Sequence, residues 1–350
     1  MAKTEKSNGK TGKAREKKLI SRSKLIFYIF SVFIFLFVVY YFSKIKTEIK
    51  LLGKVNVYWL LPAVLAQGCT YLFNAIIYRS LLGAYKLQKL PSLWDLFQVS
   101  IVSLFFNQTV PSAGVSGNTF FFNFLVKRNM PIPKIISLIL AELLTFYAAM
   151  ELIVVFFLIG FLFFHKLPSV FLTVLIAGFA IYIVFGVLII VVGKKRSFDL
   201  LYKKIKRIKF IKKFFENLKQ KWQQQATLKR EEHALFFLRD NKWIAIKTLL
   251  FQLIIFAADG FTLFALFNGL GVHASAFVVL LSLACTKIIS ILPFLPGSLI
   301  LYESGMTYFF VGLGIPFGPS IIVTLLYRLF SFWVPIPIGL VLYRRLNRSV

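Results

Sequence analysis

The sequence predicts an all-α polytopic membrane protein with about six full spans and two oppositely oriented re-entrant helical hairpins, arranged as an inverted repeat. Three observations lead to this prediction. Of the 350 residues, 58% are hydrophobic and 41 are Phe, beside only 13 acidic residues, which is not the composition of a water-soluble domain. About six apolar stretches reach the roughly 20 residues that a bilayer span needs. Two further apolar stretches are interrupted by Pro, Gly and polar residues.

The predicted spans form two membrane halves, residues 25–192 and 243–343. The spans themselves are 25–43, 57–78, 135–164, 170–192, 243–267 and 320–342. Three basic segments flank the halves: the tail 1–24, the loop 193–242 and the end 344–350. Because cytoplasmic segments collect Lys and Arg, we expect a multi-pass protein of the cell membrane with both termini in the cytoplasm.

The formal charge of +29, from 42 basic and 13 acidic residues, would suggest nucleic-acid binding in a soluble chain. Here the positive charge adjoins membrane spans, so we attribute it to topology and to contact with the anionic inner leaflet, and expect no nucleic-acid partner. Residues 203–213 interleave Lys with Ile and Phe, which predicts an amphipathic helix on that leaflet. A solvated charged helix is the alternative.

The assigned sides of the membrane decide how the two interrupted stretches lie. Residues 92–126 must start and end on the cytoplasmic side, and residues 274–315 must start and end outside. Each stretch therefore reads as a re-entrant hairpin, and the two point in opposite directions.

A fixed offset of 185 residues relates the two halves. It maps Pro111 onto Pro296, Pro131 onto Pro316, Asn74 onto Asp259 and Asn118 onto Glu303, and it places Glu142 opposite Tyr327. Opposed hairpins at matching positions are a recurring plan of transporters. Coincidence among loop prolines is the alternative.

Six ionisable residues fall inside apolar stretches, at an insertion cost of roughly 2.5–3.5 kcal/mol each near the bilayer centre. They are Glu142, Glu151, Asp259, Lys287, Glu303 and Arg328. Arg328 lies too deep to reach the surface, so we expect it to pair with Glu303, Asp259 or Glu142. Lys287 either adds a second positive charge or neutralises Glu303. Glu142 and Glu151 lie on opposite helix faces, and we take Glu142 as the inward residue and leave Glu151 for another helix contact.

Irregular backbone at bilayer depth must be buried in protein or line a wet cavity. The helices that begin after Gly114 and Gly297 would present N–H groups to a phosphate or carboxylate. Candidate binding residues at the two breaks are Asn107, Pro111, Gly114, Asn118, Pro296 and Gly297. A structural hairpin without a ligand is the alternative.

Catalytic signatures are weak. His165, His233 and His273 lack the spacing of a metal site, and there is no Gly-rich nucleotide loop or Ser–His–Asp set. We therefore expect no metal, no cofactor and no enzymatic activity.

Four motifs in order resemble the flippase-like membrane family, which is the transmembrane region of lysylphosphatidylglycerol synthases. They are Val110-Pro111-Ser112-Ala113-Gly114, Ala141-Glu142-Leu143-Leu144, Leu295-Pro296-Gly297 followed by Glu303, and Leu326-Tyr327-Arg328-Leu329. The resemblance covers about residues 25–346, and it adds weight to Pro111, Gly114, Glu142, Pro296, Gly297, Glu303 and Arg328. Leu143 stands where the family often has a basic residue, and Gly297-Ser298 where Gly-Gly is usual.

The resemblance implies movement of lipids or lipid-linked sugars across the membrane. No aminoacyl-transfer domain accompanies the spans, so we do not expect lysyl transfer. We expect a translocase for an anionic phospholipid or a polyprenyl-phosphate-linked lipid, with Arg328, Glu142, Glu303, Asp259 and Lys287 binding the headgroup. The alternatives are a membrane-embedded enzyme acting on lipid headgroups and a non-transporting scaffold for a lipid synthase or glycosyltransferase.

Overall fold

A computed structural model describes residues 48–85, 90–110, 115–163, 168–192, 234–291 and 298–348. The predicted span 25–43, the tail 1–24 and most of the basic loop 193–242 lie outside these ranges. The chain divides into residues 1–50 and 51–350, and the helices described below belong to the second unit. A short 3₁₀ helix, η1 (Glu48–Lys54), runs across the boundary in sequence. Within the described ranges the chain forms helices and short connections, and no strand.

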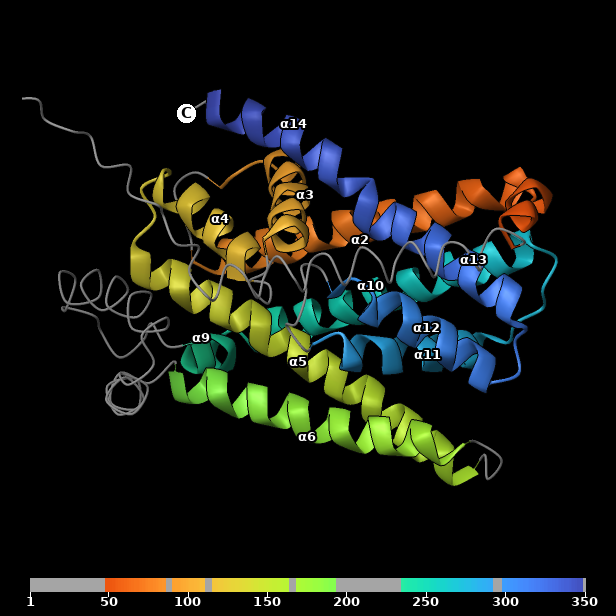
Figure 1. The fold of residues 1–350 in the computed structure, drawn as a ribbon. Coiled ribbons are helices and arrows are strands. Elements are labelled where there is room, and N and C mark those ends of the chain that lie inside the picture. Colours follow the sequence, from red (N-terminus) through yellow and green to blue (C-terminus); the bar gives the residue numbers. More distant parts are fainter. Residues whose placement is uncertain are drawn as a thin grey trace, which may run out of the picture. The chain divides into compact units, whose positions relative to one another are not determined.

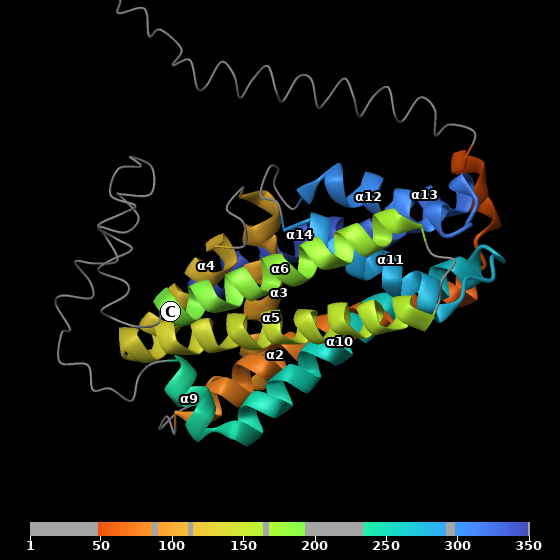
Figure 2. The same cartoon turned by 90° about the horizontal axis from the view of Figure 1, so that it is seen from below.

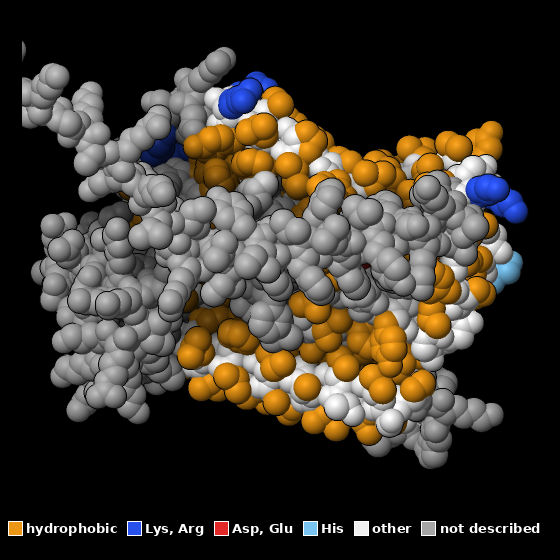
Figure 3. Space-filling model, in the orientation of Figure 1, with side chains coloured by type: hydrophobic (Ala, Val, Ile, Leu, Met, Phe, Trp, Pro, Cys, Tyr) orange, Lys and Arg blue, Asp and Glu red, His pale blue; other side chains and the backbone are white. Residues whose placement is uncertain are grey.

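Five of the predicted spans are helices long and apolar enough to cross a membrane, which makes the chain a multi-pass membrane protein. Four of them are α2 (Val57–Ala84), α5 (Ile132–Phe163), α6 (Ser169–Val192) and α10 (Lys242–Gly269). The fifth covers Phe317–Leu346. Figure 3 shows hydrophobic side chains over much of the described surface in view, as lipid-facing helices require.

α2 and α10 pack against each other in antiparallel orientation along one side of the helices (Figures 1 and 2). The Asn56 amide, at the start of α2, donates to the Gly269 carbonyl at the end of α10, at 2.8 Å. Farther along, Phe73 and Phe251 place their rings 5.5 Å apart. Fully buried Ala63 allows close approach, and its carbonyl accepts from the Thr262 hydroxyl at 3.4 Å.

The first interrupted stretch forms two helices that pack on each other, α3 (Leu93–Thr109) and α4 (Val115–Val126). Ser92 caps α3 by accepting from the Asp95 amide. Arg128, just after α4, lies 3.8 Å from the Asp95 carboxylate, so the pair closes back on its own start. The helix–break–helix pattern predicted from Pro and Gly is therefore present.

The second interrupted stretch forms α11 (Ala276–Ile289) and α12 (Leu301–Gly312), which also pack on each other. Ser275 caps α11 by accepting from the Val278 amide. Past the break, the Ser298 hydroxyl donates to the Ser290 carbonyl at 2.6 Å, which ties the two helices together. The break centres, residues 111–114 and 292–297, lie outside the described ranges.

The predicted span 320–342 differs from expectation, because it is not one regular helix. It consists of α13 (Phe317–Arg328), a π-helical turn η4 (Leu329–Trp333) and α14 (Pro335–Arg348). Proline lacks an N–H and clashes with the carbonyl four residues before it. Pro335 therefore leaves the Ser331 carbonyl without its helical N–H donor. The Val334 amide donates to the Leu329 carbonyl, five residues back, at 2.9 Å, as in a π-helix.

Side chains from two other helices satisfy the carbonyls that this π turn releases. The Tyr71 hydroxyl of α2 donates to the Phe330 carbonyl at 3.0 Å. The Gln108 amide of α3 donates to the Ser331 carbonyl at 2.9 Å. Near the next turn, Gly339 of α14 lets α3 come so close that a Cβ there would overlap Phe105. The irregular turn is thus joined to α2 and α3 by directed hydrogen bonds and close packing.

We expect Tyr71→Phe to lower the free energy of unfolding by about 1–3 kcal/mol, because the Phe330 carbonyl loses its donor while the ring keeps its shape. Tyr58→Phe is the matched control, since the Tyr58 side chain is 88% exposed. Thermal unfolding of the purified proteins in detergent measures the difference. Equal melting temperatures for the wild type and both variants would contradict a stabilising role for the Tyr71 hydrogen bond.

Candidate functional site

Four of the six predicted intramembrane ions form two ion pairs around the second helix pair. Arg328 of α13 lies 2.6 Å, from Nε to Oε1, from Glu303 of α12. Lys287 of α11 lies 2.9 Å, from Nζ to Oδ2, from Asp259 of α10. One ion pair therefore joins α11 to α10, and the other joins α12 to α13. Of the three partners expected for Arg328, Glu303 is the one it contacts.

The Glu303 carboxylate has two functions. Its Oε1 faces Arg328, and its Oε2 accepts from the Ile300 amide at 2.6 Å. Ile300 stands at φ 72°, a left-handed conformation rare for a β-branched residue, just before α12 begins. Glu303 therefore both neutralises Arg328 and satisfies an N–H at the helix start, so the two features are coupled.

Aromatic rings enclose the Arg328 guanidinium. Its central carbon lies 4.6 Å from the ring centroid of Tyr302 and 4.2 Å from that of Phe332, within the range of cation–π attraction. Tyr302 stacks in turn on Tyr327, with centroids 6.2 Å apart. Phe332 belongs to the π turn, so the irregular backbone also shapes the surroundings of Arg328.

One of the two roles predicted for Lys287, neutralisation of Glu303, is wrong. Arg328 already occupies that carboxylate, and Lys287 pairs with Asp259 instead. The Asp259 side chain is 8% exposed and that of Lys287 is 23% exposed. The pair is thus largely removed from the surface, where loss of either partner leaves an uncompensated charge.

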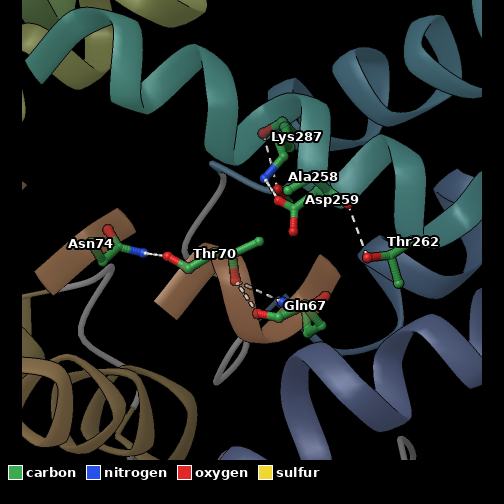
Figure 4. Close-up of polar contacts among 8 residues, drawn as sticks. Gln67, Thr70, Asn74, Ala258, Asp259, Thr262 and Lys287 are labelled. Atoms are coloured by element: carbon green, nitrogen blue, oxygen red, sulfur yellow. Dashed lines mark hydrogen bonds and ion pairs between the residues drawn. The ribbon is translucent and has the colours of Figure 1, made fainter. Parts of the chain in front are cut away.

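The Asp259–Lys287 pair faces a polar stripe on α2 (Figure 4). The Gln67 amide donates to the Thr70 hydroxyl at 3.0 Å, and the Asn74 amide donates to the Thr70 carbonyl at 3.0 Å. The Gln67 side-chain oxygen is buried and has no hydrogen-bond partner within the described part of the chain. It is an unused acceptor beside an ion pair.

Sequence reasoning missed this stripe and the aromatic enclosure. A usable signal was present, because Gln67, Thr70, Tyr71, Asn74 and Tyr78 recur at helical spacing along one otherwise apolar span. Of these five residues, the predictions above include only Asn74, as the equivalent of Asp259 in the repeat.

The remaining predicted residues have other surroundings. Glu142 of α5 lies near Gln252 of α10, Tyr78 of α2 and Tyr147 of α5. Asn107 accepts from the Gly117 amide at 2.7 Å, so it caps the first turn of α4 from across the break. Asn118 is half-buried on α4. Pro111, Gly114, Pro296 and Gly297 lie outside the described residues.

The chemistry available here is electrostatic. Where the structure describes the chain, three or more His, Cys, Asp or Glu side chains nowhere gather as metal ligands would. The described site offers two cations, their carboxylate partners and neutral acceptors, all within apolar helices. Such groups can exchange partners with a charged ligand.

Comparison with known proteins agrees with this architecture. Residues 26–339 match the family described as the lysylphosphatidylglycerol synthase TM region. The UPF0104 membrane protein PH1989 of Pyrococcus horikoshii is 23% identical over 320 residues, which cover 89% of this chain and 93% of that protein. The chain therefore belongs to the family of the lysylphosphatidylglycerol synthase TM region.

Proposed function

We propose that the protein is a translocase, rather than an enzyme, that moves a lipid with an anionic headgroup across the bilayer. The headgroup is that of a phospholipid or of a polyprenyl-phosphate-linked lipid. The observation that carries the proposal is the pair of charge contacts that hold α11 and α12 to α10 and α13. Buried ions in membrane helices are costly, and their common use is in the path of a charged substrate.

Partner exchange gives the physical mechanism. Two oxygens of a phosphate can each accept a hydrogen bond from one of two N–H groups of Arg328, and the Lys287 ammonium adds a second positive charge. When the headgroup takes these cations, Glu303 and Asp259 are released as counter-ions. The contacts that anchor α11 and α12 then weaken at the same moment, so binding and movement of that helix pair are linked.

We further propose that the chain is an inverted repeat and that both helix pairs are re-entrant. The helix bounds support this, because adding 185 to the bounds of α2 (57 and 84) yields those of α10 (242 and 269). The same offset takes the bounds of α5 (132 and 163) to the start of α13 (317) and the end of α14 (348). The antiparallel contact of α2 with α10 is the one that inverted equivalents make across a two-fold axis. By the positive-inside rule we place both chain ends in the cytoplasm, and the basic loop against anionic lipid.

The two halves differ in how their helix pairs are seated. α3 lies tightly on α14, with Phe105 against Gly339. Its equivalent α11 lies on α6, where Ile288 fills the space beside Gly178, and meets α5 through Phe277. If the two halves exchanged these arrangements, a site open to one side of the membrane would become open to the other side.

Arg328→Ala is expected to slow movement of anionic and polyprenyl-phosphate lipids in proteoliposomes by about tenfold or more, a barrier change of about 1.4 kcal/mol. Zwitterionic lipids serve as the comparison. Arg239→Ala, at an exposed ion pair, is the matched control and should keep wild-type rates. No movement of any lipid by folded wild-type protein would leave the scaffold alternative in its place.

Loss of Lys287 separates structural from functional roles. Lys287→Met alone should destabilise the fold by about 3–5 kcal/mol, because it leaves the Asp259 carboxylate buried and unpaired. Adding Asp259→Leu removes the orphan charge and should restore the melting temperature. Lipid movement should stay lost in the double variant. Wild-type lipid movement by the double variant would show that this pair is structural only.

Cross-linking tests the exchange between halves in a background with Cys69 and Cys285 replaced by Ser. A Cβ at Gly339 would lie closer to that of Phe105 than the roughly 3.5–4.5 Å of a disulfide, so Phe105→Cys with Gly339→Cys should cross-link once α3 and α14 separate slightly. The offset of 185 maps this pair onto Ser290 and Val154. Ser290→Cys with Val154→Cys should cross-link more when substrate lipid is present. A second pair that never cross-links under any condition would contradict the exchange.

A further inference from the structure

Glu151 is an ionisable residue that the two ion pairs leave unused. It lies well inside α5, roughly 28 Å from the first residue of the helix at about 1.5 Å per residue. Both of its carboxylate oxygens are buried, and neither has a hydrogen-bond partner among the residues that the structure describes. Its depth and its missing partners set it apart from Glu303 and Asp259.

The described surroundings of Glu151 supply no cation. Among the described residues, every ion pair involves Arg128, Arg239, Lys287 or Arg328, and none of these reaches Glu151. The group that faces it from α6 is Tyr182, which is also near Tyr147 of α5 and Cys285 of α11. An ionised carboxylate without donors or a cation is strongly disfavoured in so apolar a place, whereas the neutral acid is tolerated.

Two tyrosines lie in the region shared by Glu151 and Glu142. Tyr182 lies near Glu151, and the rings of Tyr182 and Tyr147 have centroids 6.0 Å apart. Tyr147 in turn lies near Glu142. A phenol both donates and accepts a hydrogen bond, so these two tyrosines have the chemistry that a proton relay between the carboxyls requires.

Glu142 lies beside the antiparallel α2–α10 pair. It is near Tyr78 of α2 and Gln252 of α10. It has no Lys or Arg as a salt-bridge partner within the described ranges. A movement of α2 relative to α10 would therefore change which polar groups lie near Glu142.

We propose that Glu151 is a proton-binding carboxyl that exchanges its proton with Glu142 through Tyr182 and Tyr147, so that lipid movement is coupled to proton movement. The step is the binding and release of one proton, from carboxylate to acid and back, with no other bond changed. The coupling rests on the proposed translocase function, whereas the protonated state of Glu151 does not. Proton relays of this composition are a known use of intramembrane acids.

Infrared spectroscopy of the full chain in liposomes tests the protonated state directly. The wild type at neutral pH should show the carbonyl stretch of a protonated carboxyl, and Glu151→Gln should lose that component. Asp240→Asn changes an exposed acid in the same way and should leave the band intact. An unchanged band in Glu151→Gln would show that Glu151 is ionised and would overturn the proposal. Because Gln resembles the neutral acid in shape, the variant should fold.

A pH gradient across the same liposomes tests the coupling, with fluorescent phosphatidylglycerol as the lipid. The gradient should change the wild-type and Asp240→Asn rates several-fold, and the residual rate of Glu151→Gln should not respond. Wild-type movement that ignores the gradient would overturn the coupling and leave the translocase standing. Absence of any lipid movement would overturn the proposed function and the coupling together, while the infrared band still decides the state of Glu151.

Discussion

Within a bilayer no water is present to accept or donate hydrogen bonds, so each polar group must find its partner inside the protein. This constraint explains the less regular parts of the structure. Pro335 releases a carbonyl in the middle of a span, and Tyr71 and Gln108 serve the carbonyls that the π turn exposes. Asn107 serves an amide across the first break, and Glu303 serves one beside the second. These four side chains each support irregular backbone inside an otherwise apolar helix bundle.

The same constraint gives the two helix pairs different characters. Neutral hydrogen bonds and close packing seat α3 and α4, and the charged contact of Arg128 with Asp95 lies at the open end of the pair. Charges at depth hold α11 and α12, through Lys287 and Arg328. An anionic headgroup competes weakly for a neutral hydrogen bond between two helices, whereas it can replace the carboxylate in an ion pair. Under the proposed function, the second helix pair is therefore the one whose contacts an anionic headgroup would change. The helix bounds of the two halves nevertheless match at the offset of 185 residues.

The sequence predicted about six spans, of which five are candidate spans in the described residues, and both helix pairs, because span length and proline position are local properties of the chain. It also narrowed the partner of Arg328 to three residues, one of which is Glu303. It did not predict the partner of Lys287, since that depends on which carboxylate Arg328 leaves available. The π turn went unpredicted as well: Pro335 and Pro337 were visible, but the donors that make the turn tolerable are on α2 and α3. Long-range hydrogen bonds of this kind leave no periodic signal.

The Tyr71 hydrogen bond has a consequence for biosynthesis. Its donor precedes its acceptor by 259 residues, and the Gln108 amide precedes its acceptor by 223. At roughly 5–20 residues per second, the ribosome supplies the acceptors between about ten seconds and a minute after the donors have entered the membrane. During that interval the two donors are in the membrane without these acceptors. A chain whose synthesis stops before η4 lacks both acceptor carbonyls.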